Sequence, residues 1–220
     1  INIYLESISN FFNNIMFGLS YLKIKRFFDI TLALLIIIIL SPLFSLIYLL
    51  NYIILGSPVF FKQERPGLEE EIFFIFKFRS LTNKKGNFGK LLPDSMRLTN
   101  YGMFIRSFSL DELPQLYNII RGEMSFVGPR PLRVEYLDYY SEEQKKRHRV
   151  KPGITGFTQI NGRNSIDWET KLKMDIFYVE NISFFLDLLI LIKTIFVVVS
   201  RKNISSRVDG TNKPFSKKYD

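Results

Sequence analysis

The chain has no cysteine and a single histidine. The absence of cysteine excludes disulfides, thiolate zinc sites and thiol nucleophiles. The one histidine, His148, stands in the charged stretch EEQKKRHRV, which predicts a solvated helix face for it. A Ser-His-Asp triad or a histidine-rich metal site is therefore poorly supported. Any acid, base or nucleophile is expected to be a carboxylate, a lysine, a tyrosine or a hydroxyl.

Acidic residues are also few in comparison with basic ones. The 220 residues include 30 Lys and Arg against 21 Asp and Glu, which gives a formal net charge of +9. Such an excess of positive charge favours partners that carry phosphate, such as nucleotides, nucleic acid or anionic lipid headgroups. The length suffices for one well-packed domain with appended segments.

One long apolar run is present, from Ile30 to Leu55. It is long enough to cross a hydrocarbon core of about 30 Å, and Ser41-Pro42 near its middle predicts a kink or break. A spanning helix normally has an excess of Lys and Arg on one side only, whereas here basic residues flank both ends. Two interpretations stay open: a re-entrant helix over residues 21–57 that enters one leaflet and returns, or an ordinary kinked transmembrane helix.

The rest of the chain predicts a compact domain over residues 58–200, of α/β class but mostly helical. Val59–Lys62 and Ile72–Phe78 have strand composition and flank a turn, so they predict a small β-hairpin. Helices are expected from Asp111 to Arg121, over 134–149 and over the apolar segment 181–200. A glycine-containing loop is expected at 150–164.

Three further segments have less specific patterns. Residues 1–20 form an N-terminal extension that suits an interfacial helix, and 201–220 form a polar tail. In the segment 181–200, Ser183, Asp187 and Thr194 share one side of a helical wheel. This arrangement favours an amphipathic interfacial or membrane-packed helix over a second membrane span.

An adjacent pair of acids, Asp111 and Glu112, stands in the motif SLDELPQL. The bland interpretation is a capping box, in which Ser109 is the N-cap and Glu112 bonds back to it. In either case Asp111 lies at a helix N-terminus, where the exposed N–H groups keep a carboxylate ionised. Arg106 precedes the pair, and Arg130 follows in the rigid turn SFVGPRPLR. Arginines beside paired acids indicate phosphoryl chemistry, with Asp111 as nucleophile or metal ligand.

Six segments of the chain occur in the order found in the bacterial sugar transferase family, which the chain resembles from about Tyr21 onward. The segments are KRFFDITLALLIIIILSPLF, KQERPG, FKFRSL, RSFSLDELPQLYNIIRGEMSFVGPRPL, RHRVKPGITGFTQINGRN and YVENISFFLDLLILIKT. The likeness is to monotopic phosphoglycosyl transferases, and within them to the small members that include those of protein N-glycosylation. Residues 1–20 have no counterpart that we can assign in these small members.

The resemblance implies a reaction and its site. Members transfer a sugar-1-phosphate from a UDP-sugar to undecaprenyl phosphate with Mg²⁺, releasing UMP, at the cytoplasmic face of the bacterial inner membrane. It implies a ping-pong mechanism in which Asp111 forms a covalent phosphosugar intermediate and also binds Mg²⁺, while Glu112 assists. It also implies a re-entrant helix broken at Ser41-Pro42.

The remaining site candidates are phosphate-binding and pocket residues. Phosphate contacts are expected from Arg106, Arg130, Lys77 and Arg79, and pocket contacts from Asn161, Arg163 and Asp175. Expected partners are the UDP-sugar, undecaprenyl phosphate, membrane lipid and downstream glycosyltransferases, with no nucleic acid. Three alternatives stay open: direct transfer in a ternary complex with Asp111 only as a Mg²⁺ ligand, a membrane-anchored basic binding protein, and a structural membrane protein.

Overall fold

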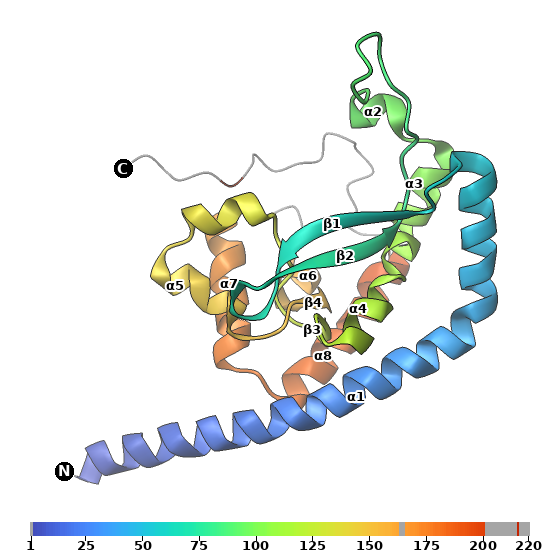
Figure 1. Cartoon of the computed structure of the whole chain (residues 1–220). Coiled ribbons are helices and arrows are strands. Elements are labelled where there is room, and N and C mark those ends of the chain that lie inside the picture. Colours follow the sequence, from blue (N-terminus) through green and yellow to red (C-terminus); the bar gives the residue numbers. More distant parts are fainter. Residues whose placement is uncertain (1, 163–165, 201–214, 216–220) are drawn as a thin grey trace.

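The first helix dominates the shape of the molecule. In the computed structural model, which describes residues 2–162, 166–200 and 215, α1 runs from Asn2 to Leu55. It passes beneath the rest of the chain and then bends upward along its side (Figure 1). Residues 2–20, expected as a separate extension, continue the same helix.

The sequence predicted a kink or a break at Ser41-Pro42, and the break is wrong because the helix continues through Pro42. Proline lacks the N–H that would bond the carbonyl of Ile38, four residues earlier. The Ser41 hydroxyl donates to that carbonyl at 2.9 Å, so its hydrogen-bonding capacity is used. The helix therefore bends without ending.

Two hairpin strands follow α1, as the sequence predicts. β1 (Phe60–Pro66) and β2 (Ile72–Phe78) pair antiparallel, with Phe60 opposite Phe78 and Pro66 opposite Ile72, and the short turn η1 (Leu68–Glu70) joins them. Phe73, Ile75 and Phe78 of β2 are buried. After β2 come the short helix α2 (Asp94–Arg97) and α3 (Asn100–Ser107), and then the turn η2 (Leu110–Glu112) leads to α4 (Gln115–Arg121).

The second half contains a small parallel sheet and two longer helices. β3 (Ser125–Val127) pairs with β4 (Gly153–Thr155), a strand in the segment expected to be a loop. Between them lie η3 (Val134–Tyr139), α5 (Glu142–Lys145) and η4 (Lys146–Arg149). The chain then forms α6 (Phe157–Ile160), α7 (Trp168–Glu180) and α8 (Phe184–Ser200).

The single helix predicted over 134–149 is wrong, because the backbone is extended at Tyr140 and Ser141. Ser141 starts a new helix with a capping box to Gln144. The solvated position predicted for His148 is also wrong. The side chain is buried, and its ring lies 5.5 Å from that of Tyr140. Burial, with the charge of Arg147 beside it, lowers the pKa of His148 to about 3, so the ring is neutral at pH 7.

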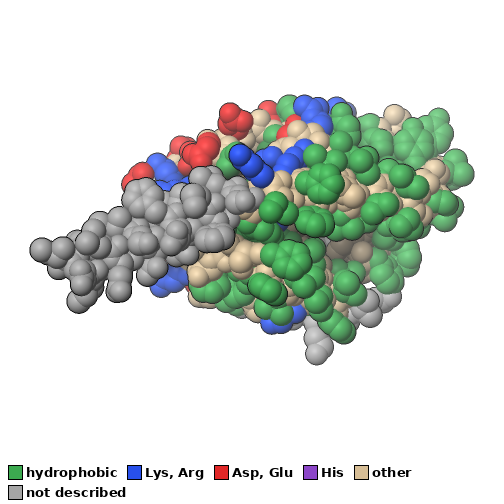
Figure 2. Space-filling model, turned by 90° about the horizontal axis from the view of Figure 1, so that it is seen from below, with side chains coloured by type: hydrophobic (Ala, Val, Ile, Leu, Met, Phe, Trp, Pro, Cys, Tyr) green, Lys and Arg blue, Asp and Glu red, His purple; other side chains and the backbone are tan. Residues whose placement is uncertain are grey.

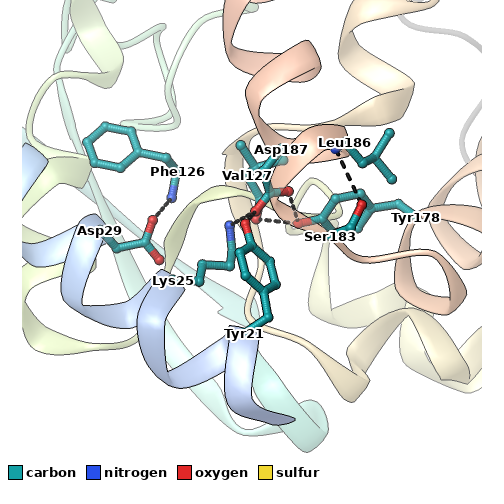
Figure 3. Close-up of polar contacts among 9 residues, drawn as sticks. All are labelled: Tyr21, Lys25, Asp29, Phe126, Val127, Tyr178, Ser183, Leu186 and Asp187. Atoms are coloured by element: carbon teal, nitrogen blue, oxygen red, sulfur yellow. Dashed lines mark hydrogen bonds and ion pairs between the residues drawn. The ribbon is translucent and has the colours of Figure 1, made fainter. Parts of the chain in front are cut away.

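A buried polar cluster joins α1 to α8 (Figure 3). The Asp187 carboxylate accepts from Lys25 Nζ at 2.6 Å and from the hydroxyls of Tyr21 and Tyr178, each at 2.7 Å. Asp29, one turn further along α1, accepts the amide in the middle of β3 at 3.2 Å. The polar side of α8 predicted from the sequence therefore faces the protein.

The opposite sides of α1 and α8 expose many large apolar side chains. Residues 21–55 of α1 form the one described helix that is long and apolar enough to cross a membrane, with a mean hydropathy of 2.8. Seen from below, apolar side chains cover much of the surface on which α1 and α8 lie (Figure 2). We call this set the apolar face; its most exposed members are Phe27, Ile38, Ile39, Ile53, Phe185, Ile195 and Phe196.

The parallel pairing of β3 and β4 depends on glycines at close backbone approach. A Cβ on Gly153 would lie 2.1 Å from the nitrogen of Gly128 and 2.3 Å from the carbonyl oxygen of Thr155. Both neighbours are backbone atoms and cannot rotate away. The glycines of the expected loop thus serve strand pairing.

We therefore expect Gly153→Ala to destabilise the protein by at least about 1–3 kcal/mol, because the added methyl forces the two strands apart. The free energy of unfolding in denaturant measures the effect. Gly86→Ala is the matched control, since its Cβ meets only the end of the Leu92 side chain at 3.2 Å. Equal stabilities of the two variants would contradict this account.

Candidate active site

Asp111 and Glu112 lie in the η2 turn, directly before α4. The capping box predicted for them is wrong: Ser109 has a left-handed backbone, with φ of 56°, and its side chain makes no capping bond. A left-handed serine is uncommon and costs of the order of 1 kcal/mol or more, so the surroundings must hold it in place. The turn therefore presents two acids at a strained position, instead of serving as an ordinary helix start.

Glu112 is held by two cations from different parts of the chain. Its Oε1 lies 2.6 Å from Lys77 Nζ of β2 and 2.9 Å from Arg130 Nη2 of the turn after β3. These two positive charges keep the pKa of Glu112 well below its usual range, although burial acts in the opposite direction. Glu112 is thus an ionised, fixed carboxylate.

Asp111 differs from its neighbour. Within the described part of the chain, no hydrogen bond or ion pair engages its carboxylate. Burial and the adjacent charge of Glu112 raise the pKa of Asp111 to about 6, against the opposing charges of Lys77, Arg106 and Arg130. The carboxylate is therefore close to three cations, ionised in most molecules at pH 7, and available to a ligand.

Arg106 reaches the site because α3 packs tightly against the end of β2. A Cβ on Gly102 would lie 2.0 Å from the carbonyl oxygen of Ser80, so only glycine permits this approach. One helical turn later, Arg106 Nε donates to the Ser80 hydroxyl at 2.7 Å. The charge of Arg106 acts on Asp111, whose pKa it lowers, and a phosphate contact of Arg106 stays a prediction.

Arg79 does not take part in the site. Its guanidinium is buried and donates to the carbonyls of Leu55, Gly56 and Ser57, where α1 ends. Arg79 therefore caps the C-terminus of α1, where a cation is favourable. The sequence predicted that Arg79 would contact phosphate together with Lys77, but β2 ends at Phe78, before Arg79.

Of the three predicted pocket residues, the two that the structure describes bond to groups outside the acid pair. Asn161 is exposed and donates to the carbonyl of Phe157 at 2.8 Å. Asp175 is buried, and its carboxylate accepts from Arg147 and from the Thr158 hydroxyl, at 2.8 and 2.6 Å. Arg163 lies outside the described residues. Asp175 thus has a structural partner set and no free oxygen directed to the acids.

Several residues near the acids were missed by the sequence analysis. Asn118 of α4 receives the amide of Phe76 at 3.1 Å and donates to the carbonyl of Phe74 at 2.7 Å, which fixes α4 against the free edge of β2. Arg65 shares a small pocket with Glu112, which we call the dyad pocket. Its walls are Arg65, Ile75, Lys77, Glu112, Gln115, Arg130, Pro131 and Gly153.

Arg65 is surrounded by like charges. Burial and the nearby guanidiniums of Arg130 and Arg133 lower the pKa of Arg65 to about 10, so it stays charged at pH 7. Several guanidiniums held close together, with few acids to balance them, favour the binding of an anion with several charges. Planar guanidiniums bind phosphate in a bidentate manner.

Arg147 was also missed, and it supports Arg130 from behind. Its guanidinium is buried, lies 2.8 Å from Asp175 Oδ2 and donates to the Arg130 carbonyl at 2.7 Å. The backbone that carries the Arg130 side chain is therefore fixed by a buried ion pair. The motif RHRV gave no signal for this role, because two neighbouring arginines in a charged run resemble a solvated surface.

These features define a class of protein: an enzyme in which two adjacent carboxylates, one held by two cations and one without a partner among the described residues, stand among arginines and a lysine in a chain with a long apolar helix. A family model described as "Bacterial sugar transferase" matches residues 20–201. The chain belongs to this bacterial sugar transferase family, and it is a phosphoglycosyl transferase.

Three relatives illustrate the family. The "Uncharacterized sugar transferase EpsL" of Bacillus subtilis is 49% identical over 189 residues, covering 86% of this chain and 92% of the relative. The "Undecaprenyl-phosphate galactose phosphotransferase" of Salmonella typhimurium is 38% identical over 81% of this chain and 41% of its own length. The "Undecaprenyl-phosphate glucose phosphotransferase" of Komagataeibacter xylinus is 39% identical over 82% and 36%. The chain thus covers less than half the length of the two relatives whose names give a substrate.

The buried ion pair behind Arg130 gives a stability prediction. Asp175→Asn leaves the Arg147 guanidinium buried without its carboxylate, and such a change costs about 3–5 kcal/mol. The free energy of unfolding in denaturant measures the loss. Glu142→Gln, which breaks an exposed pair with Lys145, is the control and should leave stability nearly unchanged. A harmless Asp175→Asn would mean that the pair does not hold this part of the fold.

Proposed function

We propose that this protein transfers a sugar-1-phosphate from a UDP-sugar to undecaprenyl phosphate and releases UMP. The observation that carries the proposal is the contrast between the two adjacent acids: Glu112 is fixed by Lys77 and Arg130, while Asp111 is free among three cations. A carboxylate nucleophile needs freedom to form a bond, and the phosphate that it attacks needs positive charge around it. The names of the relatives from Salmonella typhimurium and Komagataeibacter xylinus support this substrate class.

The proposed chemistry has two steps. An Asp111 oxygen attacks the β-phosphorus of the UDP-sugar, an O–P bond forms, and the bond to the α-phosphate oxygen breaks as UMP leaves with its electron pair. An oxygen of undecaprenyl phosphate then attacks the phosphosugar, which breaks the Asp111–phosphorus bond and restores the carboxylate. The product is an undecaprenyl-diphosphate-sugar. Arg106, Arg130 and Lys77 offset the charge of the phosphates in both steps.

A magnesium ion fits the donor set. In the described residues, no group of three or more acidic or histidine side chains forms a ready-made metal site. Mg²⁺ commonly takes one or two carboxylates together with substrate phosphate oxygens and water, so the free Asp111 carboxylate suits it. When bound, the ion would neutralise negative charge on the phosphates.

The apolar face supports a location at the membrane. We propose that α1 enters one leaflet and returns at the cytoplasmic face of the bacterial inner membrane, as the bend at Pro42 and the basic residues at both ends favour. Leu110 and Leu113, on either side of the acids, pack against the same buried cluster as Leu43 and Phe44 of α1. The acids would then stand near the level of the lipid headgroups, where a soluble donor meets an acceptor whose tail stays in lipid.

The covalent step can be tested directly. Wild-type protein incubated with UDP-sugar and no acceptor should release one equivalent of UMP and gain the mass of a phosphosugar. Asp111→Asn should abolish both signals, and Glu112→Gln should slow turnover with the fold intact. Asp94→Asn, an exposed aspartate on α2, is the matched control. UMP that appears only after the acceptor is added, with no mass gain, would favour direct transfer in a ternary complex.

The pKa of Asp111 gives the expected pH dependence. The nucleophile is the ionised form, and its pKa is about 6, so the ionised fraction rises with pH through that value. Release of UMP in a single turnover without acceptor should therefore increase about tenfold between pH 5 and pH 7 and then level off. Circular dichroism at each pH shows whether the protein stays folded. A flat rate across this interval would disprove the assignment of Asp111 as the titrating nucleophile.

A further inference from the structure

An aromatic slot adjoins Arg147, which lies over the ring of Tyr140. The rings of Tyr136, Tyr140 and Trp168 enclose it, and the ring of Phe215, from the C-terminal segment, occupies it. The Phe215 centroid is 5.7 Å from that of Tyr136 and 5.4 Å from those of Tyr140 and Trp168. Tyr136 and Trp168 also contact each other edge to face at 5.5 Å. The slot thus has the dimensions of one planar ring.

The slot adjoins the cations of the dyad pocket through two connections. Arg147 lies over the Tyr140 ring at 5.7 Å and donates to the Arg130 carbonyl at 2.7 Å, so one guanidinium touches both places. The second connection runs through η3, which carries Tyr136 and contacts β1, the strand that carries Arg65. The pKa of Arg65 responds to Arg133 and to Tyr136. Arg147 and Arg65 thus connect the slot with the dyad pocket, and Arg133 lies near Arg65.

The order of these groups, aromatic rings followed by arginines, matches a nucleoside diphosphate. Such a ligand has a planar base at one end, a ribose, and then two phosphates that need positive charge. Bases stack on aromatic side chains, and their phosphates pair with arginine. A ring in the slot would leave the phosphates beside Arg65 and Arg130 and the terminal phosphate toward Asp111.

We propose that the slot formed by Tyr136, Tyr140 and Trp168 binds the base of the donor nucleotide, and that Phe215 occupies the same place when no nucleotide is bound. The proposal rests on the proposed function for the identity of the donor as a UDP-sugar. It adds a base-binding site, and it makes the Phe215 side chain a competitor of the donor. Phe215 must leave the slot for a base to enter.

The slot contains its own probe, because Trp168 is the single tryptophan of the chain. Titration of the full-length protein with UDP or UMP should change the Trp168 fluorescence in a saturable manner. Inorganic pyrophosphate has no base, so it should leave the emission unchanged. Emission that responds equally to pyrophosphate, or to none of the three ligands, would overturn the proposal.

Variants then separate stacking from competition. Calorimetry should show UDP binding about tenfold weaker in Tyr136→Ala, because a stacking partner is lost, and unchanged in Tyr136→Phe. Phe215→Ala should bind UDP several-fold more tightly, since the competitor is absent. Tyr117→Ala, a half-exposed tyrosine on α4, is the matched control. Thermal unfolding of each variant shows that the fold is retained.

The failures of the two proposals can be told apart. If Tyr136→Ala melts like the wild type and binds UDP with unchanged affinity, or if Phe215→Ala does not tighten binding, the slot proposal is wrong while sugar-phosphate transfer stands. If UDP binds with the expected pattern but no UDP-sugar ever yields UMP, the proposed function is wrong and the slot remains a nucleotide site. In active protein, Tyr136→Ala should raise KM for the UDP-sugar with kcat nearly unchanged.

Discussion

The arrangement of the candidate site depends on one carboxylate oxygen, Oε1 of Glu112, which is shared by Lys77 and Arg130. The three residues come from the η2 turn, from β2 and from the segment after β3, so this contact joins the two halves of the domain at the site. The Glu112 side chain is 15% exposed and that of Lys77 is 21% exposed, so solvent screens this ion pair less than the pair with Arg130, whose side chain is 47% exposed. Glu112 holds Lys77 and Arg130 near Asp111, and both cations lower the pKa of Asp111 although neither forms an ion pair with it among the described residues.

The cations themselves are held by contacts further from the acids. Arg147 and Asp175 fix the backbone at Arg130, and Asn118 fixes β2 to α4 and so sets the position of Lys77 relative to η2. These supports are buried polar groups with their hydrogen bonds satisfied, which makes each of them expensive to disturb. The geometry at Asp111 is therefore a property of the whole domain, and distant substitutions should affect it.

The sequence predicted the parts of this structure that depend on local pattern. Strand composition predicted β2, the helix expected from Asp111 to Arg121 contains α4, and Arg130, expected near the acids, contacts Glu112. It failed where tertiary contacts decide. Arg79 leaves the strand pattern to cap α1, and His148 is buried although its neighbours are charged. Asp167 caps α7, a signal that was present in the sequence and was missed.

The link between the apolar helix and the acids explains why the bend at Pro42 matters. Leu43 and Phe44 follow the proline directly, and they pack in one cluster with Leu110 and Leu113, the residues that bracket the acid pair. On the same helix, Ile38 and Ile39, just before the proline, are among the most exposed apolar residues. A straight helix would continue in the direction of those exposed residues and carry Leu43 and Phe44 away from η2. The bend thus gives one helix two kinds of surroundings: an exposed apolar side before the proline, and, after it, packing against the same buried cluster that the residues flanking Asp111 and Glu112 contact.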